Sequence, residues 1–251
     1  MLTKISDVDI VYSRLSLKQY ARKRVLRGRD SERSREAQRT LIRELRHLKQ
    51  LSHRHLIKII ASYTNLEYIS FIMEPVAELD LERLLAMPGN IAPGYQSVLR
   101  RFFGCLAGAV NYPHQSKIRH RDITARKILI YREEICISDF GSAYNWSNRP
   151  VSATRHHPTP VSPDHQAPEI ARREERDSKS DIFSLGLVFL EMTTKLLGRS
   201  TSELKRVISM NAEKHNSDQP YVYANLPVVL TWLDELMRET RLSTIMSHWF
   251  E

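Results

Sequence analysis

Four short motifs between residues 120 and 186 hold most of the side chains that could do chemistry. They read HRD at 120–122, DFG at 139–141, APE at 167–169 and DIFSLG at 181–186. HRD precedes a strand-like apolar run, and DFG follows the next such run. Carboxylates of this kind accept protons or bind hard divalent cations such as Mg²⁺. Each motif alone is a weak signal, but chance does not readily assemble all four in this order.

The ordered set resembles the eukaryotic protein kinase family, and the resemblance extends over essentially the whole chain. It implies ATP-dependent phosphoryl transfer to protein Ser/Thr, with ATP and Mg²⁺ as cofactors and a protein as substrate or partner. It also implies an α+β, two-lobed protein kinase-like fold with a small β-rich N-lobe and a larger helical C-lobe. We therefore expect one kinase-like domain over 1–251, with the N-lobe at 1–75 and the C-lobe at 76–251.

The resemblance assigns a role to each of four charged residues. Asp122 would accept the proton of the substrate hydroxyl, and Asp139 would hold Mg²⁺ against the β- and γ-phosphates. Lys23, in the sequence YARK, would grip the α- and β-phosphates, with Glu44 as its ion-pair partner. The alternative is that Lys23 and Glu44 are ordinary surface residues in a basic stretch.

Positions that match the family's nucleotide pocket would bind the cofactor: Val11, Ala21, Met73, Glu74, Val76 and Leu129. Among them, the side chains at 11, 21 and 129 would sandwich the adenine, and the methionine would take the gatekeeper position. The adenine would hydrogen-bond to the backbone of the linker after the sequence FIMEPV. A packed column would join Leu48, Ile59, His120 and Phe140, although plain core packing explains the apolar members equally well.

The first departure from the family pattern is the missing glycine-rich loop, whose backbone N–H groups would approach the phosphates. The matching stretch, KISDVDIV at 4–11, holds no glycine, and none stands before Gly28. Asp9 would add a negative charge near the phosphates. Because the chain starts only a few residues earlier, we expect a first strand to be absent or truncated.

The second departure lies in the catalytic loop, HRDITARK. Thr124 stands where Ser/Thr kinases place a lysine, and Lys127 stands where they place a metal-binding asparagine. An ammonium has no lone pair and cannot bind Mg²⁺, so Lys127 is predicted to enter the metal pocket and pair with Asp139. Such a change would cost about 10²–10³ in rate, by analogy with the loss of one preorganised stabiliser. Arg126 would supply the missing cation, as in tyrosine kinases; the alternative is a surface arginine.

The loop before APE carries the remaining expectations. The sequence VSP at 161–163 resembles the family's GTP segment, so Ser162 is expected to hydrogen-bond near Asp122. Arg121 is expected to pair with Thr154 or Thr159 when that residue is phosphorylated, the alternative being an unmodified flexible loop. Glu169 and Arg241 resemble the pair that ties the loop's end to a late helix, and His156 and His157 have no metal-ligand company.

The elements that must position these residues follow from the hydrophobic periodicity. Alternation predicts two strands within 8–26 and further strands at 56–63, 68–73, 127–131 and 134–138. Helical spacing predicts helices at 31–51 and at 95–112, the latter ended by Pro113. A long loop at 145–168 precedes a buried helix at 182–192, and a polar break at 211–220 divides the helical remainder.

Composition bounds the class of protein. The 251 residues hold two cysteines in no paired or metal-type spacing, which fits a reducing compartment. We see neither a membrane helix nor a signal sequence, and expect a cytoplasmic protein, with the nucleus as the alternative. The net charge is +9, and the segment 22–54 alone holds twelve basic and four acidic residues. We interpret that segment as a solvated helix face, because no aromatic interleaving accompanies it, and expect neither nucleic acid nor a membrane as partner.

Three hypotheses about function follow. The first is a Ser/Thr kinase that is slow. The second is a pseudokinase that acts as a binding, scaffold or nucleotide-gated module, and it explains the glycine-free loop, Thr124 and Lys127 together. The third is a decayed or truncated family member without an independent role.

Overall fold

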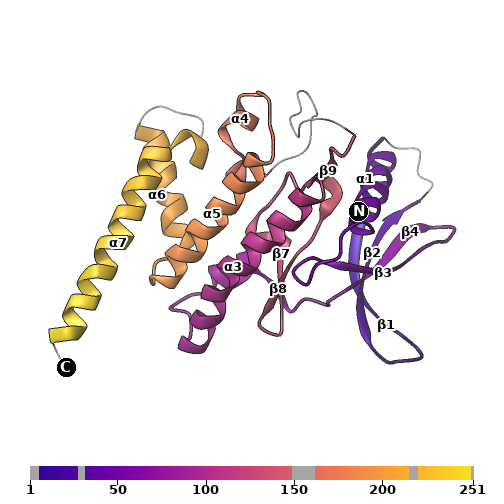
Figure 1. Ribbon diagram of the computed structural model, residues 1–251, viewed down its shortest axis with the longest axis horizontal. Helices are drawn as coiled ribbons and strands as arrows, with labels where there is room; N and C mark the ends of the chain where they lie inside the picture. Colours follow the sequence, from indigo (N-terminus) through magenta and orange to yellow (C-terminus); the bar gives the residue numbers. More distant parts are fainter. Residues whose placement is uncertain (1–5, 28–31, 149–161, 215–219, 250–251) are drawn as a thin grey trace. The chain divides into compact units, whose positions relative to one another are not determined.

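The computed structural model describes residues 6–27, 32–148, 162–214 and 220–249, without the side chains of 33, 34, 93 and 240–249. The chain forms two compact units. One consists of 1–80, 104–121 and 126–152, and the other of 81–103, 122–125 and 153–251. Each unit is described below by itself (Figure 1).

The first unit contains a four-stranded antiparallel sheet in the order β1-β2-β4-β3. Its strands are β1 (Ser6–Tyr12), β2 (Gln19–Leu26), β3 (Lys58–Thr64) and β4 (Tyr68–Glu74). Helix α1 (Glu32–Leu48) packs against β2 and β3 through a stripe that includes the buried Leu41 and Leu48. The predicted strands and the predicted helix of this region are confirmed.

The pairing of β1 with β2 decides which side chains share a face of this sheet. Ile10 lies opposite Ala21, and Val8 lies opposite Lys23. Because directly opposed residues project from the same face, Val11 and Asp9 project from the other one. There Asp9 accepts hydrogen bonds from Arg22, which lower the pKa of its carboxyl group.

Two smaller sheets complete the first unit. Strands β5 (Leu79–Asp80), β7 (Ile128–Tyr131) and β8 (Glu134–Ile137) form an antiparallel sheet in the order β5-β7-β8. Strand β6 (Ile118–Arg119) pairs with β9 (Tyr144–Asn145). The short 3-10 helix η1 (Ala125–Lys127) precedes β7, and η2 (Phe140–Ser142) follows β8. The predicted pair of strands around 127–138 is confirmed.

Helix α3 (Pro93–Gln115), which both units share, is longer than predicted. It does not end at Pro113, which lies inside it. A proline removes only its own N–H, and the helical bonding resumes beyond it, with Ser116 N–H donating to the Tyr112 carbonyl. The helix ends at Gln115, just before Lys117 takes a left-handed φ of 58°.

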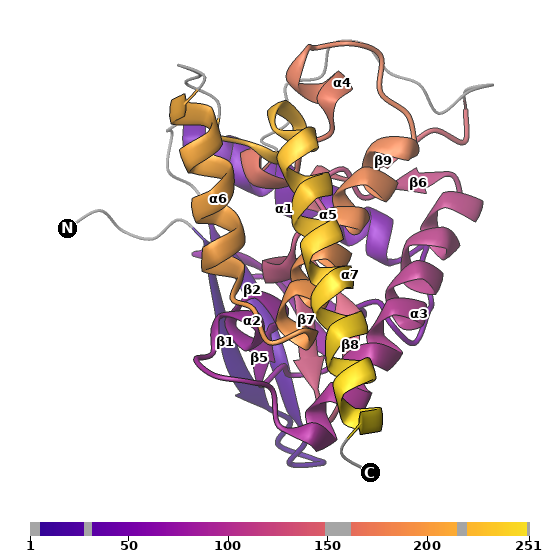
Figure 2. The ribbon, with the colours of Figure 1, turned by 90° about the vertical axis from the view of Figure 1, so that its left-hand side faces the viewer.

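The second unit is helical. It contains α2 (Leu81–Ala86), η3 (Pro163–His165), α4 (Pro168–Ala171), α5 (Lys179–Leu196), α6 (Thr201–Lys214), η4 (Val222–Ala224) and α7 (Leu226–Trp249). Helix α5 contacts α2 and α6, and α6 contacts α7 (Figure 2). The side chains that form its main buried cluster are Leu190, Leu204, Ile208, Val229, Trp232 and Leu236. Helix α5 is largely buried as predicted, but Ile182, which is 52% exposed, and Gly186 face solvent. None of the helices, as far as their residues are described, combines the length and the apolar character needed to cross a membrane.

A buried hydrogen bond joins two helices of this unit and generates a prediction about stability. The Trp232 indole N–H donates to the Thr194 hydroxyl at 3.0 Å, and both side chains are buried. Thr194→Val leaves the indole N–H unpaired, so we expect a loss of about 1–3 kcal/mol in the free energy of unfolding, measured by urea denaturation. Thr193→Val on the same helix is the matched control, with a change within about 0.5 kcal/mol. Equal losses in the two variants would contradict the prediction.

Candidate functional site

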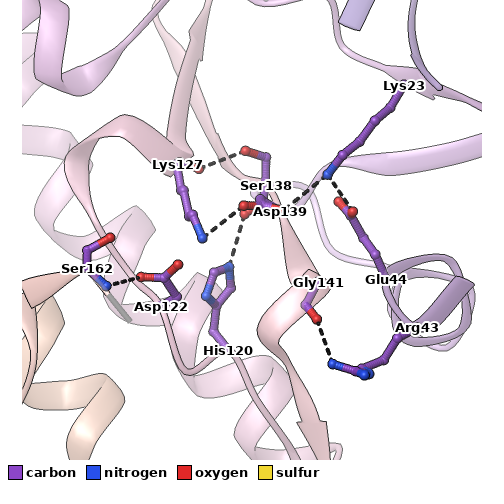
Figure 3. A network of polar contacts seen from close by, with 10 residues as sticks. All are labelled: Lys23, Arg43, Glu44, His120, Asp122, Lys127, Ser138, Asp139, Gly141 and Ser162. Atoms are coloured by element: carbon purple, nitrogen blue, oxygen red, sulfur yellow. Dashed lines mark hydrogen bonds and ion pairs between the residues drawn. The ribbon is translucent and has the colours of Figure 1, made fainter. Parts of the chain in front are cut away.

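Four charged side chains of the first unit form one continuous network (Figure 3). Lys23 Nζ lies 2.5 Å from Glu44 Oε2 and 3.1 Å from Asp139 Oδ1. Lys127 Nζ lies 2.9 Å from Asp139 Oδ2. The predicted contacts of Lys23 with Glu44 and of Lys127 with Asp139 are therefore both present.

The ion pair of Lys23 and Glu44 joins the sheet to α1. Lys23 projects from the face of β2 that α1 covers, and the Glu44 side chain is only 2% exposed. Burial disfavours the charged ammonium, but the carboxylates of Glu44 and Asp139 outweigh it and raise the pKa of Lys23. Both partners are too enclosed to be the ordinary surface residues of the alternative interpretation.

Asp139 is positioned by the turn that follows β8. Its backbone is left-handed, with φ 65° and ψ 63°, immediately before η2. Aspartate tolerates this conformation better than most residues. Burial disfavours the ionised carboxylate, but the ammonium groups of Lys23 and Lys127 outweigh burial and hold the pKa of Asp139 well below its usual range. Asp139 is therefore a fixed anion between two fixed cations.

Lys127 is anchored through its backbone. The Ser138 N–H and hydroxyl donate to the Lys127 carbonyl at 2.9 and 3.0 Å. The Ser138 carbonyl in turn lies 3.0 Å from His120 Nε2. The Lys127 side chain is 16% exposed. Its ammonium is thus part of the built site rather than a solvent-exposed group that meets Asp139 by chance.

The residues present do not fit Mg²⁺ at Asp139. Mg²⁺ needs oxygen ligands at about 2.0–2.1 Å, and an ammonium supplies no lone pair. Each Asp139 oxygen already contacts an ammonium, so a cation would have to displace Lys23 or Lys127. Within the described parts of the chain, no three or more His, Cys, Asp or Glu side chains come together as a metal site.

Asp122, Thr124 and Ser162 lie in the second unit. The Ser162 backbone N–H donates to Asp122 Oδ1 at 3.2 Å, so the expected contact with Ser162 is made by the backbone rather than by the hydroxyl. Thr124 is buried, and its hydroxyl has no hydrogen-bond partner among the described residues. Arg126 belongs to the first unit and is exposed, as the surface interpretation expects.

The structure corrects two expectations about the adenine pocket. Val11 and Ala21 project from opposite faces of the sheet, so these two side chains do not sandwich one ligand. Ile10 and Met73 are the cross-strand neighbours of Ala21 on the same face. Asp9 likewise faces Arg22 on the far side, so it does not add charge beside Lys23. Both errors have one reason: the motif match assigned positions on β1 without fixing which face of the strand each side chain takes.

The other predicted cofactor residues are Leu129, Glu74 and Val76, all of which belong to the first unit. Leu129 is on β7 in the three-stranded sheet, where it pairs with Cys136. Glu74 forms ion pairs with Lys18 at 2.5 Å and Lys58 at 3.3 Å. Together with Val76, it lines an open groove of about 1020 Å³ in the first unit. The carboxylate of Glu74 is therefore committed to two lysines.

The predicted packed column is present in part. The rings of His120 and Phe140 meet edge to face, with centroids 4.6 Å apart, and both are buried. Leu48 is buried on α1, which packs on η2, whereas Ile59 is only partly buried. Other predictions concern parts of the chain outside the described residues: Thr154, His156, His157, Thr159 and the side chain of Arg241.

Sequence reasoning missed the contacts that hold α1 against η2. Arg43 donates to the Gly141 carbonyl at 3.5 Å, and a Cβ on Gly141 would lie 2.7 Å from the Thr40 methyl group. It also missed the two hydrogen bonds from Ser138. The position of Ser138 directly before DFG was the only signal available.

Comparison with known proteins agrees with the geometry of this site. A family model described as "Protein kinase domain" matches residues 4–243. The chain is 32% identical over 152 residues to Mitogen-activated protein kinase kinase kinase 12 of Rattus norvegicus, a match that covers 60% of the chain and 16% of that protein. It is 29% identical over 180 residues to Serine/threonine-protein kinase ULK3 of Rattus norvegicus, covering 68% of the chain and 36% of that protein.

A third relative is MAP3K epsilon protein kinase 1 of Arabidopsis thaliana. It is 26% identical over 156 residues, a match that covers 62% of the chain and 11% of that protein. The chain thus spans between 11% and 36% of the length of these three relatives.

The close approach of η2 to α1 predicts a steric effect. Gly141→Ala places a methyl group against Thr40, and we expect a loss of about 1–3 kcal/mol in the free energy of unfolding, measured by urea denaturation. The backbone of Gly141 is not left-handed, so the cost is one of contact alone. Adding Thr40→Ser removes the clashing methyl group and should restore most of the loss. If the double variant is no more stable than Gly141→Ala, Thr40 is not the obstacle.

The lowered pKa of Asp139 predicts a pH dependence of stability. A carboxyl group whose pKa falls on folding stabilises the folded state above its unfolded pKa, about 3.9, and this contribution disappears as the pH drops toward the folded value. We therefore expect Asp139→Asn to lower the free energy of unfolding by a constant amount between pH 5 and 8. The difference from the parent protein should shrink below about pH 4. Urea denaturation across this range measures it, and a difference that is unchanged at pH 3 would contradict the assignment.

Proposed function

This chain belongs to the protein kinase family, and from that premise we propose that it is a catalytically impaired member, a pseudokinase domain that works by binding a partner protein. The observation that carries the proposal is the 2.9 Å ion pair between Lys127 and Asp139. Phosphoryl transfer in this family depends on a metal ion that bridges the β- and γ-phosphate oxygens and neutralises developing charge. An ammonium in contact with the metal-binding carboxylate takes the place of that ion.

Two further features support impaired transfer. The described strands β1 and β2 and the turn between them contain no glycine, so no glycine of this hairpin lets backbone N–H groups approach the phosphates closely. The buried hydroxyl of Thr124 stands where Ser/Thr kinases place a lysine. Together with Lys127, these changes alter three separate contacts to phosphate or metal.

A slow Ser/Thr kinase is the second candidate. Lys23, which would bind the phosphates, keeps its 2.5 Å ion pair with Glu44. Asp122 remains a hydrogen-bonded carboxylate. One relative, named Serine/threonine-protein kinase ULK3, supports protein Ser/Thr as the substrate class under this interpretation. Exposed Arg126 would then have to supply the cation that Thr124 does not.

We also infer that the partner of this chain is a protein rather than a nucleic acid. We propose separately that this chain is cytoplasmic. Part of the basic segment is neutralised on the surface. Arg22 pairs with Asp9, Arg24 lies 3.4 Å from Asp7, and Arg39 lies 3.7 Å from Glu36. These pairs support the interpretation of 22–54 as a solvated face, because its arginines are partly occupied by carboxylates of the same unit.

A transfer assay with labelled ATP, Mg²⁺ and a generic Ser/Thr protein substrate separates the two candidates. We expect the parent chain to transfer no more phosphate than Asp122→Asn, which lacks the proton acceptor. Ser162→Ala is the matched control, since the backbone N–H that contacts Asp122 is retained. Transfer by the parent chain and by Ser162→Ala that clearly exceeds the Asp122→Asn background would replace the pseudokinase proposal with the slow kinase.

A further inference from the structure

We propose that the site around Asp139 binds nucleotide phosphate without a divalent cation, with Lys127 as a built-in substitute for the metal charge. This inference deepens the proposed function and rests on its assignment of the site as a nucleotide site. It concerns binding and not transfer, so it can fail while the proposed function stands.

The first support is competition for the carboxylate. Lys23 contacts one oxygen of Asp139 at 3.1 Å, and Lys127 contacts the other at 2.9 Å. A divalent cation would compete with an ammonium for either oxygen and would be repelled by the one that remained. A phosphate anion does not compete for Asp139, and it is attracted by both ammonium groups. The arrangement therefore favours an anion over a metal ion.

The second support is the rigidity of Lys127. Its carbonyl accepts two hydrogen bonds from Ser138, and Ser138 is linked in turn to the buried ring of His120. These bonds fix the backbone of Lys127 beside Asp139, and the 2.9 Å ion pair holds its ammonium group there, so a metal ion could take that place only by breaking the pair. Lys127 is the last residue of η1, and β7 begins at the next residue, so both elements fix its backbone.

The third support is the balance of charge. Lys23 and Lys127 carry two positive charges, and Glu44 and Asp139 carry two negative charges, so the network is neutral without any metal ion. Bonds from an ammonium group to a phosphate oxygen are charge-assisted, and bonds of this kind are the strong ones in phosphate recognition.

Titration of ATP into the whole chain, once with EDTA and once with excess Mg²⁺, tests the proposal. Binding is followed by isothermal calorimetry and by the thermal shift of unfolding. We expect the parent chain to bind ATP in EDTA at least as tightly as in Mg²⁺. We expect Lys127→Asn to weaken binding in EDTA by about tenfold to a hundredfold and to make it depend on Mg²⁺. Lys179→Asn, which removes an equal charge from an exposed position, should match the parent chain.

The outcomes separate the proposal from the proposed function. ATP binding by the parent chain only in Mg²⁺ overturns the metal-free site, whatever the transfer assay gives. No ATP binding in either condition also overturns it, while a pseudokinase that binds only proteins remains. The comparison of EDTA with Mg²⁺ needs the parent chain alone, so a Lys127→Asn variant that fails to fold leaves the test intact.

Discussion

A carboxylate held between two ammonium groups is the constraint on which the first unit depends. Asp139 lies in the turn between β8 and η2, Lys23 comes from the middle of β2, and Lys127 ends η1 just before β7. Two sheets and the loop after β8 must therefore be placed so that three charges meet within about 3 Å. Glu44 extends the same requirement to α1, because it is buried and its charge is compensated by Lys23. Lys23 links the two carboxylates, so removing it leaves the buried Glu44 without this ion pair.

The contacts that position the turns of this site do not depend on which side chain stands at position 127. The His120 and Phe140 rings pack edge to face, and Ser138 binds the backbone of Lys127 rather than its side chain. Backbone bonds of this kind accept any residue type at that position. A change between asparagine and lysine therefore alters the charge of the site while the turn that presents it stays the same.

The contacts between charged side chains could be predicted where a motif identified both residues of the pair. The pairing of Lys127 with Asp139 followed from the family resemblance, which puts Lys127 at the position of a metal-binding asparagine, and the confirmed strands followed from alternation. The face of β1 was not predictable, since Val8, Ile10 and Val11 place apolar residues at both parities of the strand. Register then depends on cross-strand pairing, and a slip of one residue reverses every side chain. Pro113 misled for a different reason: a proline near a helix end costs little when the next N–H groups find partners.

The close approach of Gly141 to Thr40 makes α1 and η2 move as one body. With Arg43 and Glu44 on the same helix bound to Gly141 and, through Lys23, to Asp139, a displacement of the helix is transmitted to the carboxylate. The outward side of α1 carries exposed charged residues such as Arg39. A protein that bound to this side and displaced α1 would move Glu44 relative to Lys23. It would thereby alter the ion pairs around Asp139 without contacting them.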